Sequence, residues 1–327
     1  MAAADLFFSV LRAAKGRPFR YFYAGKVQIL MFHRVVASMG KNRIVNEGIE
    51  VTEKYLEQLI NYYLEQDFIP ASIDELPRLL KEKNNKRYVI FTFDDGYLDN
   101  YEKALPVFEK YNIPFAVYIT TDFIERKQFA WWYFLEDVIA KNEKIVCKHQ
   151  LSTKEISCKT AAEKEKTFIA LREQIQASPS VLSAFIELYS PDLKKYHDLF
   201  LTETQLVTFS KHPLVTIGSH TVSHISLAKS SDEQVHHEIT DSKSILEKMI
   251  GKKVEHFAYP FGTAADVGER EIKLAEKAGY VTALTTAYGA AAKDTSLFAL
   301  PRIWTSESHT KRDLIQSSSG YNSFRMK

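Results

Sequence analysis

The chain has 327 residues, which is enough for one large domain or two small ones, or for an α/β barrel of about 250 residues with an insertion. The hydrophobic fraction of 45% and the charged fraction of 26% are ordinary for a folded soluble protein. Because 43 basic side chains balance 41 acidic ones to a formal net charge of +2, the protein has no global field that would hold nucleic acid, and we expect no nucleic-acid partner.

Residues 1–26 predict an amphipathic helix or arm. Apolar residues recur there at helical spacing and basic residues follow, namely Leu6, Phe7, Val10 and Leu11, then Arg12, Lys15, Arg17 and Arg20. We favour a helix packed on the barrel, with peripheral contact to a membrane surface as the alternative. Asp5 and Arg12 argue against a signal peptide, and no apolar run is long enough to span a membrane. We therefore expect a cytoplasmic protein, at most peripheral to the inner face of the membrane.

From residue 27 onward, short apolar runs rich in β-branched residues alternate with helical patterns. The predicted strands are Val27–Phe32, Tyr88–Phe93, Phe115–Thr120, Leu214–Gly218, His256–Tyr259 and Val281–Thr285. The predicted helices are Tyr55–Glu65, Asp99–Tyr111, Asp232–Ile250 and Glu269–Ala278. Such an alternation favours parallel strands joined by crossover helices.

The stretch from about residue 131 to 209 breaks this alternation. It is long and rich in Lys and Glu, as in the segment KNEKIVCKHQ, and we interpret it as a helical insertion after one barrel strand. Its charged residues indicate a solvated helix face rather than a binding patch. Cys147 and Cys158 do not form a CxxC pair, and we expect two thiols in a reducing compartment.

Two adjacent carboxylates follow the strand predicted over Tyr88–Phe93. In a parallel barrel the carboxyl ends of the strands form the active-site face. Gly96 permits a turn directly after Asp94 and Asp95, so both side chains can reach one site. One carboxylate could then bind a metal ion while the other acts as a base. The alternative is a turn that merely caps the next helix.

Two histidines follow the strand predicted over Leu214–Gly218, in the motif SHTVSH. The spacing of His220 and His224 predicts two imidazoles on one face of a helical turn, as metal binding requires. One oxygen of Asp95 would complete a three-ligand site. The coordination positions left for water and substrate are typical of a catalytic metal rather than a structural one.

Three other strand ends carry weaker signals. The YPFG segment that contains Phe261 forms a turn that can aim a backbone N–H at an oxyanion. The LPRI segment can place Arg302 as a buried cation. In the LMFHR segment, His33 ends the first predicted strand, where it is either a plausible acid or simply a packed histidine.

Together, TFDDG, SHTVSH, YPFG and LPRI resemble the motifs of the polysaccharide deacetylase family, also called the NodB-homology or carbohydrate esterase family 4 group. The matches run from about residue 33 to 302, with the insertion outside them. The resemblance implies an α/β fold, a distorted (β/α)₇-type barrel. It also implies a divalent metal ion, most often Zn²⁺ with Co²⁺ or Ni²⁺ as alternatives, and hydrolysis of an N-acetyl or O-acetyl group on a sugar.

The resemblance also implies roles for individual residues. Asp94 looks like the general base, and Phe261 holds the position of an aromatic residue whose backbone N–H lines the oxyanion site. The residues that look like metal ligands are Asp95, His220 and His224.

The chain departs from the family pattern at two positions. Ala258 stands where the family normally has an Arg that pairs with the base, and we hypothesise that Arg302 supplies this cation from another strand. The last motif lacks the usual catalytic histidine. The LMFHRV segment resembles the N-terminal strand of the biofilm-polysaccharide N-deacetylases, in which an N-terminal histidine is the proposed acid, so His33 is our candidate for that role.

We therefore predict a deacetylase that acts on an acetylated sugar of a surface polysaccharide or of its lipid-linked intermediate. Trp131, Trp132 and Tyr133 either stack on that sugar or anchor the insertion to the barrel. One alternative is a metal-dependent hydrolase of non-sugar cyclic amides. The other is a carbohydrate-binding homologue that has lost catalysis.

Overall fold

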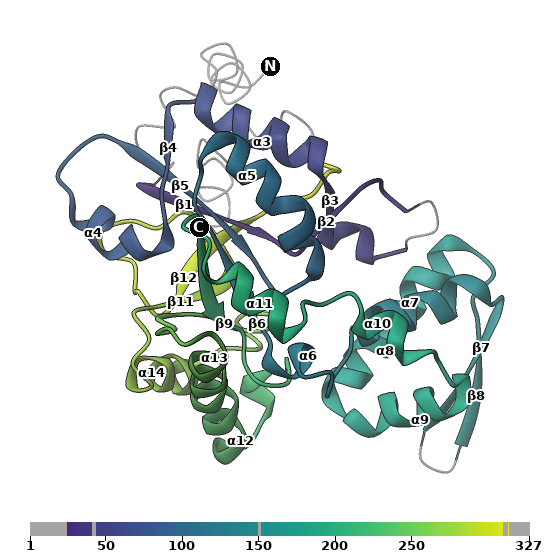
Figure 1. Ribbon diagram of the computed structural model, residues 1–327. Helices are drawn as coiled ribbons and strands as arrows, with labels where there is room; N and C mark the ends of the chain where they lie inside the picture. Colours follow the sequence, from purple (N-terminus) through teal and green to yellow (C-terminus); the bar gives the residue numbers. More distant parts are fainter. Residues whose placement is uncertain (1–24, 41–43, 150–151, 310–312, 314–327) are drawn as a thin grey trace, which may run out of the picture.

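The computed structural model describes residues 25–40, 44–149, 152–309 and residue 313. Within these residues, seven parallel strands close into a barrel in the order β1-β12-β11-β10-β9-β6-β5 and back to β1, which confirms the predicted fold (Figure 1). The strands are β1 (Val27–Phe32), β5 (Arg87–Phe93), β6 (Phe115–Ile119), β9 (Val215–Ser219), β10 (His256–Ala258), β11 (Thr282–Tyr288) and β12 (Leu300–Trp304). The helix predicted over residues 1–26 lies almost wholly outside the described residues and stays a prediction.

The six predicted strands are confirmed, with ends that agree within three residues. The seventh, β12, was not predicted as a strand. It is short and contains Pro301, and a proline usually argues against a strand that pairs on both sides. A further short strand, β4 (Phe68–Pro70), pairs with the beginning of β5.

Alternate residues of the barrel strands point in opposite directions. On β5, Phe91 and Phe93 belong to the large core between the sheet and the helices, whereas Ile90 packs with lumen residues such as Tyr118 of β6. Thr92 continues the inward series of β5, and Asp94 lies two residues beyond it at the mouth of the barrel. The alternation of the strand therefore directs Asp94 into the lumen.

Helices cover the outside of the barrel. The flanking helical segments are α3 (Glu53–Glu65), α5 (Leu105–Tyr111), α6 (Thr121–Ile124), α11 (Glu203–Phe209), α12 (Asp232–His236), α13 (Ser242–Ile250) and α14 (Glu269–Lys277). The short helix α4 (Leu76–Lys81) instead packs its buried leucines against the lumen residues. Shorter segments are β2 (Arg34–Val36), β3 (Glu50–Thr52), η1 (Asn46–Ile49), η2 (Ile73–Glu75) and η4 (Leu227–Lys229).

Two predicted helices contain a wider π-helical turn that their sequence pattern did not indicate. The turn η3 (Asn100–Ala104) precedes α5, and the turn η5 (His237–Asp241) joins α12 to α13. Turns of this kind are frequent at functional sites because they shift the side chains that follow them. Both turns carry residues that contact the candidate site.

Between β6 and β9 the chain forms a separate helical region with its own hydrophobic core, on the right in Figure 1. It consists of α7 (Trp131–Lys141), α8 (Ala161–Ala177), α9 (Pro179–Tyr189) and α10 (Leu193–His197), with the antiparallel hairpin β7 (Lys144–His149) and β8 (Ser152–Ser157). The helical interpretation of KNEKIVCKHQ was wrong. Ile145 is buried between more exposed neighbours, an alternation typical of a strand. No helix among the described residues is long and apolar enough to cross a membrane.

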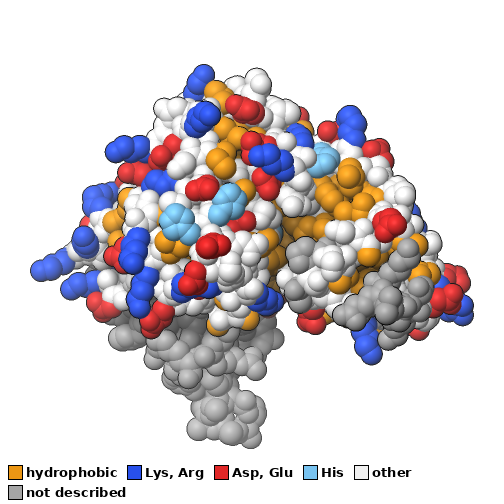
Figure 2. Space-filling model, turned by 90° about the horizontal axis from the view of Figure 1, so that it is seen from below, with side chains coloured by type: hydrophobic (Ala, Val, Ile, Leu, Met, Phe, Trp, Pro, Cys, Tyr) orange, Lys and Arg blue, Asp and Glu red, His pale blue; other side chains and the backbone are white. Residues whose placement is uncertain are grey.

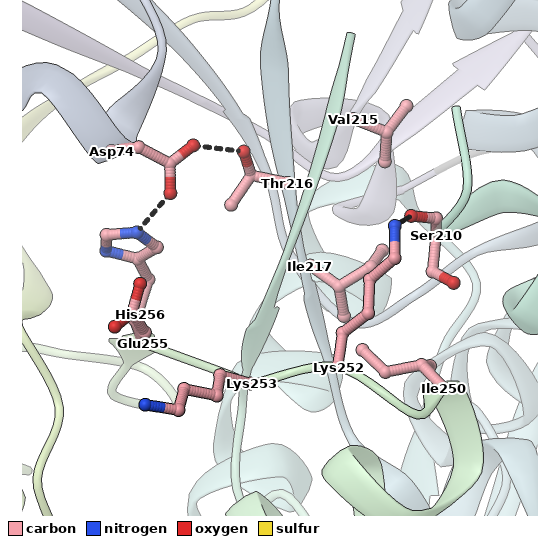
Figure 3. A pocket seen from close by; sticks show the side chains of 10 residues that line it. All are labelled: Asp74, Ser210, Val215, Thr216, Ile217, Ile250, Lys252, Lys253, Glu255 and His256. Carbon is pink, nitrogen blue, oxygen red and sulfur yellow. Dashed lines mark hydrogen bonds and ion pairs between the residues drawn. The ribbon is translucent and has the colours of Figure 1, made fainter. Parts of the chain in front are cut away.

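The amino ends of the strands are closed by a cluster of polar side chains around Asp74 of η2 (Figure 3). Asp74 accepts a hydrogen bond from Thr216 at 2.8 Å and contacts Nε2 of His256 at 2.9 Å. His256 is buried, and its other ring nitrogen lies 2.8 Å from the hydroxyl of Thr282. Asp74 thus joins the segment before α4 to the starts of β9 and β10, at the end of the barrel opposite Asp94.

We predict that Asp74→Asn weakens this closure. The hydrogen bond from His256, with those from Ser72 and Thr216, holds the pKa of Asp74 below its usual value near 4. The ionised carboxylate therefore stabilises the fold above about pH 4, and that stabilisation is lost as the pH falls further. Because the side chain is about half exposed, we expect a loss of about 1 kcal/mol at pH 7, measured by urea unfolding.

The matched control is Asp294→Asn, which removes an exposed carboxylate elsewhere on the barrel and should leave the free energy of unfolding unchanged. The difference between Asp74→Asn and the unchanged protein should shrink when the pH is lowered below about 4. An Asp74→Asn protein as stable as the Asp294→Asn control at pH 7 would contradict the proposed closure.

Candidate active site

A buried ion pair lies at the carboxyl end of the barrel strands. Arg302 of β12 donates two hydrogen bonds to Asp94, at 2.8 Å to Oδ1 and 2.7 Å to Oδ2. Its Nε donates at 2.9 Å to the carbonyl of Thr285. Burial alone would raise the pKa of Asp94, but Arg302, together with His220 and His33, outweighs burial and holds that pKa below its usual value. Asp94 is therefore ionised, and Arg302 fixes its orientation.

Asp95, His220 and His224 come together beside this pair. Oδ1 of Asp95 lies 3.4 Å from Nε2 of His220 and 3.2 Å from Nε2 of His224. Asp95 has a φ of 76° and Gly96 a φ of 81°, so the chain turns sharply at the end of β5. That turn allows two adjacent carboxylates to serve one site, as the sequence pattern predicted.

The histidine motif does not form the helical turn that we predicted from its spacing. His220 directly follows β9, and the chain then runs through a loop in which Thr221 and His224 have φ values of 68° and 59°. These left-handed residues fold the loop back on itself. The two imidazoles meet through loop geometry, and the His-x3-His spacing predicted their proximity for the wrong reason.

A second layer of contacts orients the histidines. Nδ1 of His220 lies 2.7 Å from the carbonyl of Ala258, which leaves Nε2 to face Asp95. Glu238 of η5 accepts hydrogen bonds from the backbone N–H groups of Val222 and Ser223, both at 2.9 Å, and from the Ser223 hydroxyl. Sequence reasoning missed Glu238, which the π-helical turn of η5 brings to this loop.

The three side chains fit a divalent metal ion. Each offers one ligand atom, and these atoms lie within 4.8 Å of one another. Burial would raise the pKa of Asp95, but His224 and His220 hold it well below its usual value. A buried carboxylate oxygen between two imidazole nitrogens has no hydrogen-bond donor that would satisfy it among the described residues. Two imidazoles and one carboxylate form a ligand set that suits Zn²⁺ or a similar ion.

His33 follows β1 and faces the same cavity. Its carbonyl accepts a hydrogen bond of 2.8 Å from Asn100 of η3, while its buried Nδ1 has no partner among the described residues. The next residue, Arg34, is held by Asp99 at 2.7 Å. Burial lowers the pKa of His33, and Asp95 and Asp94 offset part of that shift. Sequence reasoning missed Asn100 and Asp99, which position the strand end.

Phe261 also lines the cavity, next to His224. Its ring packs edge-on against His224, with centroids 4.9 Å apart, and its carbonyl accepts a hydrogen bond of 2.7 Å from Thr286. Phe261 and Gly262 have φ values of 59° and 60°, so the YPFG segment is a tight turn. The oxyanion role of the Phe261 N–H stays a prediction.

These groups open into one cavity of about 370 Å³, which the helical region helps to enclose. The cavity is lined by Met31, His33, Asn46, Ile49, Asp94, Asp95, Trp131, Trp132, Arg172, His220, His224, Phe261, Thr286 and Trp304. Seen from below in Figure 2, hydrophobic side chains also line the hollow between the barrel and the helical region. Sequence reasoning missed Arg172, Asn46 and Trp304, which carry no recognisable motif.

The three aromatic residues at the start of α7 lie in two different surroundings, and stacking on a sugar stays a prediction. Trp131 and Trp132 line the cavity, and the indole N–H of Trp132 donates to the hydroxyl of Tyr97 at 3.1 Å. Tyr133 instead donates to Glu50 at 2.8 Å and anchors the helical region to the barrel.

Comparison with known proteins finds one family model along most of the barrel. The model described as polysaccharide deacetylase matches residues 81–283. The Bacillus subtilis (strain 168) protein YxkH, itself named as a polysaccharide deacetylase, is 25% identical over 278 residues, which cover 85% of this chain and 71% of that protein.

Solved structures show the same fold. The Streptococcus pyogenes deacetylase PplD in complex with acetate superposes with a TM-score of 0.62 at 20% identity, over 90% of this chain and 98% of that one. IcaB from Ammonifex degensii superposes with a TM-score of 0.57 at 15% identity, over 90% of this chain and 97% of that one. His33 and Arg302 lie outside the matched range of the family model, one beyond each end.

We predict strong energetic coupling between Asp94 and Arg302. Removing one partner leaves the other charge buried without compensation, so Arg302→Met and Asp94→Ala should each destabilise the fold by about 3–5 kcal/mol. The double variant should be more stable than the sum of the two losses by about 2–3 kcal/mol, measured by urea unfolding. The same cycle on the exposed pair Arg78 and Glu82 should give less than about 0.5 kcal/mol. Additive losses at Asp94 and Arg302 would contradict the buried pair.

We also predict that the cluster binds one divalent ion. Zn²⁺ added to chelator-treated protein should stabilise it by about 2.7 kcal/mol at a hundredfold excess over the dissociation constant, measured by thermal unfolding. His224→Ala should lose this gain because one of three ligands is missing. His237→Ala, which removes an exposed imidazole, should keep it. An equal gain in both variants would show that Zn²⁺ binds elsewhere.

Proposed function

The chain belongs to the polysaccharide deacetylase family, and from this premise we propose that it is a metal-dependent enzyme that removes N-acetyl groups from a surface polysaccharide or its lipid-linked intermediate. As a member it is a hydrolase that acts on carbon–nitrogen bonds other than peptide bonds. One observation supports the proposal above all: an ionised carboxylate, Asp94, lies beside the ligand set of Asp95, His220 and His224 in a single cavity.

Asp94 is proposed to take a proton from the attacking water. A carboxylate has about four lone-pair positions, and Arg302 occupies two of them, so Asp94 keeps the capacity to accept that proton. The ion pair lowers the basicity of Asp94 but fixes its direction, and a fixed direction is what a positioned base needs. A divalent ion held by Asp95, His220 and His224 would supply Lewis-acid polarisation of the acetyl carbonyl and of the water.

The reaction consumes one water and breaks the bond between the acetyl carbon and the sugar nitrogen. The hydroxyl joins the acetyl carbon, and the nitrogen leaves as an amine after it gains a proton. We propose that His33 delivers this proton. Because burial favours the neutral form of His33, His33 must gain a proton during turnover before it can donate one. The proton that Asp94 takes from the attacking water can be passed to His33 for this purpose.

The walls of the cavity suit a sugar ring. Trp131, Trp132 and Trp304 present aromatic surface near the polar floor, and aromatic faces pack well against the apolar faces of sugars. The histidines and carboxylates at the floor are the polar groups that would fix the orientation of the acetamido group.

The test is acetate release by metal-loaded protein from N-acetylglucosamine oligomers, with O-acetylated xylo-oligosaccharides and cyclic ureides in parallel. We expect turnover of the N-acetylated oligomers and a loss of at least about a thousandfold in Asp94→Asn, because the base is gone. Asp294→Asn should match the unchanged protein. Circular dichroism should show that all three proteins are folded.

The parallel substrates separate the alternatives. Hydrolysis of a cyclic ureide without acetate release would favour the non-sugar amidase, and acetate release from the xylo-oligosaccharides alone would favour O-deacetylation. Unchanged acetate release by Asp94→Asn would refute the proposed mechanism, and no hydrolysis of any substrate by metal-loaded protein would favour a binding protein.

A further inference from the structure

Arg172 of α8 reaches the substrate cavity from the helical region. It lies far from the sequence motifs, in a stretch whose charged residues we interpreted as a solvated face. The structure places it in the lining of the same cavity as the Asp95 cluster. Its Nε is buried and has no hydrogen-bond partner among the described residues. That interpretation is therefore wrong for Arg172.

The acidic groups of the cavity do not neutralise Arg172. Asp94 forms an ion pair with Arg302, and Asp95 lies between the two histidines. Among the described residues that line the cavity, Arg172 is a cation without an ion-pair partner. A buried guanidinium N–H without an acceptor is unfavourable, because the N–H has lost its water contacts and no protein group replaces them. A ligand that brings an acceptor would remove that cost.

The neighbours of Arg172 make a charged ligand group more effective. Trp131 and Trp132 of the adjoining helix α7 line the same cavity and are both largely buried. Apolar walls exclude water, and charges attract each other more strongly where water is excluded. A guanidinium also presents parallel N–H groups whose spacing matches the oxygens of a carboxylate or a phosphate.

We propose that Arg172 binds an anionic group of the substrate, a carboxylate or a phosphate, so that the enzyme prefers acidic acetylated saccharides to neutral ones. This inference rests on the proposed function and specifies its substrate class. The acetamido group would lie at the Asp95 cluster on the barrel, and the anionic group would lie at the helical region. Arg172 then acts in specificity rather than in the hydrolytic step.

The experiment compares three forms of one N-acetylglucosamine tetramer: neutral, oxidised to a carboxylate at one C6 position, and phosphorylated at the reducing end. The rate constant kcat/KM for acetate release is measured with metal-loaded protein. We expect at least one charged form to be preferred to the neutral one by about tenfold or more, since each good charge-assisted contact contributes at least that factor. The two charged forms distinguish a carboxylate from a phosphate.

Substitutions test whether Arg172 causes the preference for charged tetramers. Arg172→Gln should reduce the ratio of kcat/KM for the charged tetramer to kcat/KM for the neutral tetramer to near one. Arg172→Lys should keep part of this preference, because it keeps the positive charge but loses the two parallel N–H donors of the guanidinium. Lys166→Gln removes an exposed cation from the same helix and should leave the ratio unchanged. A ratio near one in the unchanged protein, or the same ratio in Arg172→Gln, would overturn the proposal.

Measuring tetramer binding without turnover tests the anion site independently of the proposed function. Tryptophan fluorescence of the Asp94→Asn protein reports binding of each tetramer without turnover. If a charged tetramer binds more tightly than the neutral one, and this difference disappears in the double variant Asp94→Asn with Arg172→Gln, the anion site is supported. Should no acetate be released in that case, only the proposed function fails. Equal binding of all three tetramers would overturn the anion site even if acetate is released.

Discussion

The buried pair of Asp94 and Arg302 is the interaction on which the candidate site depends. A carboxylate in the mouth of an apolar barrel is stable only with a compensating cation, and here the cation comes from the strand that closes the ring. The family resemblance led us to expect this cation at the position of Ala258, and in this chain Arg302 places a guanidinium against Asp94 from another strand instead. The chemical requirement is met by a residue at a different position in the sequence.

The wall of the cavity depends on a second buried carboxylate. Glu136 of α7 accepts hydrogen bonds from the backbone N–H groups of Ile44, Val45 and Asn46, at 2.7, 2.8 and 3.0 Å. It also accepts one from the side chain of Asn46 at 3.0 Å. The helical region is therefore fastened to the segment before β3 through polar contacts as well as through Tyr133. Since Asn46, Trp131 and Trp132 line the cavity, its shape follows from this attachment.

Much of this arrangement could be predicted from the sequence, for a physical reason. Strand ends of a parallel barrel meet on one face, so Asp94, Asp95, His220 and His224 could be brought together from local patterns alone. Glu238 could not, because it acts on backbone N–H groups and a π-helical turn brings it there. Asn100 could not be predicted either, because the π-helical turn η3 brings it to the backbone carbonyl of His33. The cavity-lining residues of the helical region could not be predicted from the sequence. No local pattern distinguishes a side chain that faces a cavity on a charged helix from one that faces solvent.

The meeting of β1 with β12 has a consequence for how the protein matures. These two strands lie near opposite ends of the described chain, yet they are neighbours in the ring. During synthesis the segment bearing Asp94 emerges from the ribosome long before the segment bearing Arg302. Until the last strand docks, the carboxylate has no counter-charge and the barrel stays open along one seam. A nascent or prematurely terminated polypeptide that lacks β12 would thus lack both the closing strand and the cation of the candidate site.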